Sequence, residues 1–323
     1  MLVYKLNLYI SIGVGILLSL LFAILCSSSI ALIFRYSESI NSNRYLITSS
    51  NYLVASLISL FLVMSSEKII WPTLLDFERF FQEFNLVFTN QQLKFTVESS
   101  NVWAVFIGII GGIFFFLAFI FYQKSVQKDG VGLAGTFAKL GILIPMILAI
   151  FFWNEIPETI QWFGIILALI AIVIVNFPFN RNWSEAVKWT LISLFIFGGL
   201  AEFTNKFFQY YGRIYEKNLF LFFVFTTAFI ISAIYVMIKN YNLRYKEFMI
   251  GIGVGIPNLF SSFFLINALD QLKTAVVFPI FSAGSIVVIS VAGYFIYGET
   301  LNRREKVAIV LTIVALIMIN IQR

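Results

Sequence analysis

The chain has 323 residues, of which 60% are hydrophobic and 12% charged, with a formal net charge of +6 and no histidine. Soluble domains carry about 25% charged residues, so this composition excludes a soluble globular protein and indicates an integral membrane protein. The positive charge fits loops beside anionic lipid, and it predicts no nucleic-acid partner because no basic face is concentrated in a soluble segment. With no histidine and the single cysteine Cys26, we expect no metal site, no cofactor and no enzymatic activity.

Long apolar runs recur along the chain, and each has about the length that a helix needs to cross a bilayer. Lipid offers no partner to backbone N–H and C=O groups, so each run is expected to be helical. The fold class is therefore predicted as all-α, a polytopic protein of the cell membrane with ten transmembrane helices. The predicted spans lie near residues 11–34, 45–65, 103–123, 130–152, 159–178, 187–211, 219–238, 247–268, 274–296 and 305–321.

One connection is much longer than the others. Residues 66–101 are polar and contain "WPTLLDFERFFQEFNLVF". Read as a helix, this stretch gathers apolar side chains on one face, which predicts an amphipathic helix on the membrane surface or capping the bundle. A gate is the alternative. The face is predicted to consist of Leu74, Phe77, Phe81, Phe84 and Phe88.

The sequence contains an internal repeat. Glu155 and Glu299 lie 144 residues apart, and aligned Phe, Gly and Asn residues around them share the same offset. The repeat divides the chain into a first unit, 1–178, and a second unit, 179–323, with five predicted spans each. Because five is odd, the two copies enter the membrane from opposite sides. Inverted repeats of this kind are typical of transporters, in which one half rocks against the other.

Two stretches carry a resemblance to a known family: "IPMILAIFFWNEIPETIQWFGIILALIAIVIVN" and "GYFIYGETLNRREKVAIVLTIVALIMIN". Each has a glutamate at the end of a helix, and the first also has Pro145 ten residues before Glu155. This pattern resembles the EamA-type members of the drug/metabolite transporter superfamily. The second half departs from it, because Pro279 lies twenty residues before Glu299 and Ala308 replaces the helix glycine.

The resemblance implies a carrier of small molecules with ten helices, in which the first, third, fourth, sixth, eighth and ninth spans surround the path. It also implies that both termini lie in the cytoplasm. The basic residues favour the side away from the N-terminus, which by the positive-inside tendency would place the termini outside. Both arguments put the two termini on one side, and we take the cytoplasmic side from the resemblance. A homodimer stays open.

Small residues recur at corresponding positions of the two halves. Gly108 and Gly112 form a G-x-x-x-G motif in span 103–123, as do Gly251 and Gly255 in span 247–268. Small residues four apart let helix backbones approach closely. Pro257 then removes a backbone donor and predicts a kink. The motifs are interpreted as helix packing, with a nearby central site as the alternative.

Glu155 and Glu299 each precede a predicted helix. A carboxylate near a helix N-terminus accepts hydrogen bonds from free N–H groups and is stabilised by the helix dipole. Both are therefore interpreted as residues that fix a helical hairpin, with substrate contact as the alternative.

Charged side chains inside predicted spans point to a binding site, because such charges are costly in a bilayer. Lys139 lies in span 130–152, and Glu202 and Lys206 lie four residues apart in span 187–211. In one interpretation, Lys139 or Lys206 neutralises Glu202 and locks the halves together. In the other, they line a cavity, where Lys139 holds a substrate carboxylate or phosphate and Glu202 an ammonium group or a proton. The polar neighbours included in this predicted substrate site are Ser28, Gln123, Asn205, Asn258, Asn267 and Ser282.

Together, these features predict a transporter that moves a small polar or amphipathic metabolite by alternating access between inverted halves. A lipid flippase or scramblase is one alternative, and it would need a polar groove open to the bilayer. A receptor that transports nothing is another.

Overall fold

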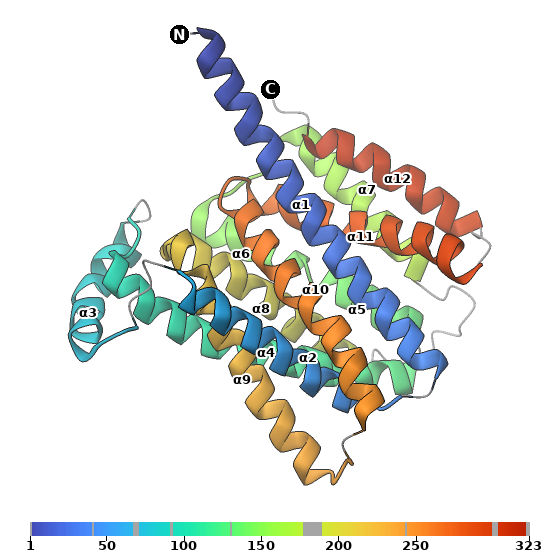
Figure 1. The fold of residues 1–323 in the computed structure, drawn as a ribbon. Helices are drawn as coiled ribbons and strands as arrows, with labels where there is room; N and C mark the ends of the chain where they lie inside the picture. Colours follow the sequence, from blue (N-terminus) through green and yellow to red (C-terminus); the bar gives the residue numbers. More distant parts are fainter. Residues whose placement is uncertain are drawn as a thin grey trace.

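The computed structural model describes residues 2–40, 42–66, 71–90, 93–129, 131–176, 189–242, 244–298 and 303–320. Throughout these ranges the fold is a bundle of helices without a strand (Figure 1), as the apolar runs predict. The elements are α1 (Leu2–Ser39), α2 (Arg44–Met64), α3 (Leu74–Thr89), α4 (Val97–Asp129), α5 (Val131–Leu140), α6 (Leu143–Trp153), α7 (Thr159–Asn176), α8 (Trp189–Tyr211), the 3-10 turn η1 (Ile214–Glu216), α9 (Lys217–Ile238), α10 (Tyr245–Leu269), α11 (Thr274–Tyr297) and α12 (Arg303–Asn320).

The helices confirm a polytopic membrane fold. Within the described ranges, eight segments are long and apolar enough to cross a bilayer, and they correspond to eight of the predicted spans. The other two predicted spans correspond to α7, which is a shorter apolar helix, and to α12. The total of ten membrane crossings stays a prediction. The first helix begins and the last helix ends toward the same, upper end of the view in Figure 1.

The fourth predicted span is not one continuous helix. It divides into α5 and α6 around Gly141, which leaves Lys139 in the last turn of α5. Pro145 has no N–H to donate to the Gly141 carbonyl, and the Ile144 N–H donates to it instead at 3.0 Å. Gly141 is also where α8 approaches, since an added Cβ would lie 3.1 Å from the Gly199 nitrogen. The predicted span over 130–152 is therefore confirmed as a membrane-length segment, with a break at Gly141 that was not predicted.

The two halves pack with matching partners. Helix α1 of the first half packs against α10 of the second, and its counterpart α8 packs against α4 of the first. In the same way, α2 packs against α10, and its counterpart α9 packs against α4. The pairs α2–α9 and α7–α12 join equivalent helices.

The directions of α1 and α8 follow from their contacts with α10. The chain after α1 meets the first turn of α10, where the Asn43 N–H donates to Glu247 Oε1 at 3.4 Å. The end of α8 meets the end of α10, where Gln209 Nε2 donates to Asp270 Oδ1 at 3.0 Å. Hence α1 and α8 run in opposite directions, as inverted repeats require.

The two G-x-x-x-G motifs lie at equivalent contacts. Gly108 and Gly112 of α4 face α9, while Gly251 and Gly255 of α10 face α2. A Cβ added at Gly112 would lie 2.5 Å from the Val224 carbonyl oxygen, so the backbones are too close for a side chain. Both motifs therefore sit between the two halves and hold them at close range.

The long connection contains the predicted amphipathic helix, α3. Asp76 accepts a hydrogen bond from the Thr73 N–H at 2.7 Å, which satisfies a free donor at the helix start. Part of the predicted apolar face packs on the bundle, through Phe77 and Phe88, and part of it points away from the protein. Leu74 and Phe81 are 86% and 65% exposed, whereas Phe80 is 3% exposed. Phe80 is buried because its ring packs against Trp103 and Phe106 of α4 and against Phe95, just before α4.

Candidate functional site

A cavity of about 270 Å³ lies between the halves. Its walls come from α1, α2, α4 and α5 of the first half and from α8, α10 and α11 of the second. On α1 and α2 it reaches from mid-helix toward the end of the bundle where the α1–α2 connection lies. The polar and ionisable lining residues are Ser27, Asn51, Tyr52, Tyr122, Lys139, Glu202, Asn258 and Ser282.

The structure brings two of the predicted charged residues to this cavity without pairing them. Lys139 and Glu202 attract each other electrostatically, yet no ion pair within 4 Å joins them among the residues described. Lys139 lies at the C-terminal end of α5, where the helix dipole favours a positive charge, and its Nζ is 5.9 Å from the Phe281 ring centroid. Glu202 accepts from Asn205 Nδ2 at 3.3 Å. The two side chains therefore line the cavity without a direct contact between them.

An amide pair spans the halves on another wall. Asn258 Nδ2 of α10 donates to Asn51 Oδ1 of α2 at 3.0 Å. Pro257 lies inside α10 beside it, and Ser282 lines the same cavity from α11. Asn51 was not among the predicted site residues. An isolated asparagine within predicted span 45–65 was the signal that could have found it.

The remaining lining is largely aromatic and aliphatic. Phe34, Phe115, Phe119 and Phe281 contribute rings, and Tyr52 donates to the Phe115 carbonyl at 3.2 Å. Small-molecule sites in proteins commonly combine apolar walls with a few placed polar groups. The lining of this cavity has the same combination.

Lys206 lies elsewhere and pairs with an unexpected partner. Its Nζ is 2.8 Å from Glu155 Oε1, and it also lies over the Trp153 and Tyr210 rings. Glu155 Oε2 accepts from the Thr274 N–H at 2.7 Å. The carboxylate thus caps α11 of the other half, not the helix that follows it, which corrects the predicted hairpin role. The expected local pairing of Lys206 with Glu202 is also absent from the described residues.

The other predicted site residues are dispersed. Ser28 donates to backbone carbonyls of α1 and α11, Gln123 accepts from the arginine at the start of α2, and Asn267 accepts from the lysine that begins α9. Asn205 is fully buried behind Glu202. None of these four lines the central cavity as described. Glu299 lies outside the described residues.

Two inverted helical halves around a shared cavity define a membrane transporter rather than a soluble binding protein. The chain belongs to the EamA-like transporter family, which it matches over residues 13–177 and again over 185–321. It is 22% identical over 303 residues to a protein of Haemophilus influenzae described as uncharacterized, covering 92% of this chain and 96% of that relative. A solved crystal structure with 14% identity superposes with a TM-score of 0.66 over 94% of this chain and 95% of the other, which shows a shared fold.

Proposed function

We propose that the protein carries a small polar or amphipathic metabolite through the central cavity by alternating access between its two halves. The observation that carries this proposal is that Lys139 and Glu202 both line the cavity without forming an ion pair. A lone ammonium at the membrane centre costs about 2.5–3.5 kcal/mol on insertion scales. A direct contact with Glu202 would reduce that cost, so charges kept apart are better explained by a cargo or water between them.

The lining residues indicate the cargo's groups. Lys139 provides a donor for a carboxylate or phosphate, and Glu202 an acceptor for an ammonium group or a coupling proton. The Asn51–Asn258 pair supplies further polar atoms, and the phenylalanine rings accept an apolar portion. A cargo with a charged end and an apolar body meets all of these groups.

Contacts at the other end of the bundle support a two-state mechanism. Beyond the cavity, the Lys206–Glu155 ion pair joins α8 to the chain after α6, and Glu155 also caps α11. Lys94 Nζ lies 3.4 Å from Asp270 Oδ1 in the same region. These groups line a pocket of about 370 Å³ and link the two halves at this end, while the central cavity reaches toward the other end. Alternating access would require that these ion pairs separate when the cavity opens to the other side of the membrane.

Uptake into proteoliposomes of purified protein tests the proposal. Radiolabelled metabolites carrying one anionic group, one cationic group or both are compared with neutral analogues, and a fluorescent phospholipid assay runs in parallel. We expect uptake of at least one charged metabolite above empty liposomes and no lipid scrambling. Lipid scrambling without metabolite uptake would favour a flippase and contradict the proposal. Saturable binding without uptake would favour a receptor.

A further inference from the structure

A second pocket lies at the end of the bundle away from the Lys206–Glu155 pair. It encloses about 510 Å³ where the α1–α2 connection, the end of α4 and the α9–α10 connection meet. We call it the basic pocket, and the lining residues that matter here are Asn43, Arg44, Gln123, Gln127, Asn240 and Arg244. Its walls come from both halves. Of these residues, only Gln123 belongs to the predicted substrate site.

The basic pocket has positive charge and no carboxylate in its described lining. Two carboxylates contact the lining, and each binds a lining residue, although Glu247 Oε2 has no partner among the described residues. Glu38 pairs with Arg44 at 2.6 Å, and Glu247 accepts from the Asn43 N–H at 3.4 Å. The Arg244 guanidinium has no hydrogen bond or ion pair with any described residue. Arg244 is therefore a free cation at the edge of a polar pocket.

Neutral donors add to this charge. Gln123 is 2% exposed, and its Oε1 accepts from Arg44 Nη1 at 3.1 Å. Its Nε2 has no partner within the described chain, although the side chain lines the pocket. A guanidinium and an amide N–H together match the oxygens of a phosphate group.

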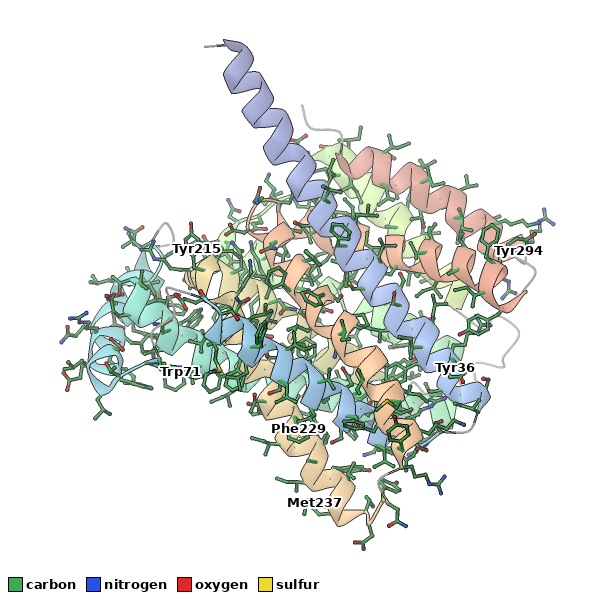
Figure 2. All side chains as sticks on the ribbon, viewed as in Figure 1. Tyr36, Trp71, Tyr215, Phe229, Met237 and Tyr294 are labelled. Carbon is green, nitrogen blue, oxygen red and sulfur yellow. The ribbon has the colours of Figure 1, made fainter. Side chains whose placement is uncertain are left out.

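The surroundings of the pocket are apolar and exposed. Met237 and Ile238, at the end of α9, are 74% and 71% exposed, and Tyr245, at the start of α10, is 78% exposed. Figure 2 shows Met237 near the tip of α9. Tyr45 and Tyr241 stack beside the pocket with centroids 5.7 Å apart. Tyrosines at helix ends next to lipid-facing side chains are typical of the headgroup layer.

We propose that the basic pocket binds the phosphate group of an anionic ligand, and that its apolar border selects an anionic phospholipid over a soluble phosphate ester. The headgroup would occupy the pocket while the acyl chains lie along the exposed ends of α9 and α10. Because α2 and α4 belong to one half and α9 and α10 to the other, the bound lipid ties the halves together at this end. This site is separate from the central cavity and does not depend on the transported cargo.

Native mass spectrometry of the full-length protein in detergent tests the site by titration with phosphatidylglycerol, phosphatidylcholine, glycerol 1-phosphate or inorganic phosphate. Arg244→Gln removes the free cation, and Gln127→Glu places a carboxylate at the exposed rim. Lys246→Gln, an exposed residue two positions beyond Arg244 and outside the pocket, is the matched control. We expect phosphatidylglycerol to bind more tightly than the other three. Arg244→Gln and Gln127→Glu should weaken the affinity for phosphatidylglycerol about fivefold or more, whereas Lys246→Gln should leave this affinity within about twofold.

Each other outcome contradicts part of the proposal. Equal binding of phosphatidylcholine, whose phosphate is balanced by choline, would overturn the preference for an anionic lipid. Equal weakening by Lys246→Gln and Arg244→Gln would overturn the assignment of that preference to the basic pocket. Inorganic phosphate or glycerol 1-phosphate binding as tightly as phosphatidylglycerol, with loss in Arg244→Gln, would keep the anion site and overturn its assignment to lipid. Unchanged phosphatidylglycerol binding in both pocket variants would overturn the site itself.

Discussion

Lys206 and Glu155 form an ion pair of 2.8 Å between the two halves, and the lysine side chain is 4% exposed. The same carboxylate caps the first turn of α11 through the Thr274 N–H at 2.7 Å. One glutamate therefore links three segments: the end of α6, the C-terminal part of α8 and the start of α11. It therefore ties the two halves together at the end of the bundle beyond the cavity.

Replacement of Glu155 should destabilise the protein. Glu155→Gln would leave Lys206 as a buried ammonium without its partner, and breaking a buried pair costs about 3–5 kcal/mol. We expect a lower melting temperature in detergent. The added Lys206→Met should recover most of the loss because no buried charge then remains. Glu158→Gln, three residues away and exposed, is the control. A melting temperature for Glu155→Gln equal to that of the control would show that the pair contributes little.

The glycine contacts should be sensitive to a single methyl group. A Cβ added at Gly255 would lie 2.7 Å from the Asn51 carbonyl oxygen, whereas one at Gly253 would meet only Ile33 at 3.8 Å. Gly255→Ala should therefore cost about 1–3 kcal/mol by overpacking, while Gly253→Ala on the same helix should be neutral or stabilising. Thermal unfolding of the two variants compares them directly. Equal melting temperatures would mean that α2 and α10 can move apart freely.

Alternating access requires that the two halves separate at the end where Lys94 and Asp270 link them. In a Cys26→Ser background, the substitutions Lys94→Cys and Asp270→Cys would replace an ion pair whose charged atoms lie 3.4 Å apart. Joining the two cysteines with a short reducible cross-linker should abolish uptake, and reduction should restore it. Single-cysteine variants treated in the same way provide the control. Full uptake by the cross-linked protein would argue against opening at this end.

Much of the architecture could be predicted from the sequence because membrane insertion imposes strong and local requirements. Apolar runs gave the helices, and the odd number of spans in each repeat gave their inversion, which the opposite directions of α1 and α8 now support. The glycine pairs indicated close helix contacts because no side chain projects there. The break after Lys139 was harder to foresee, since Gly141 and Pro145 are also tolerated within continuous membrane helices.

The site was less predictable because its contacts join distant parts of the chain. Spacing by four residues favours Glu202 as the partner of Lys206, but the actual partner, Glu155, is brought near by the packing of α6 on α8. Composition could not show that Asn51 faces Asn258, because rotation of α2 about its axis is set by its contacts with α9 and α10. Lys139 and Glu202 could be identified because charge inside a span is rare and costly.

The most direct test of the central claim is the transport rate of Lys139→Met, Glu202→Gln and the double variant in proteoliposomes, measured beside their melting temperatures. Since the two residues form no ion pair, each single variant should fold with a melting temperature close to that of the unmodified protein. Each should lose at least about tenfold in uptake, because one cargo contact worth about 1.4 kcal/mol or more is gone. The double variant should be no more active than either single variant. Full uptake by the double variant would contradict the account, because neither charge would then be needed for transport.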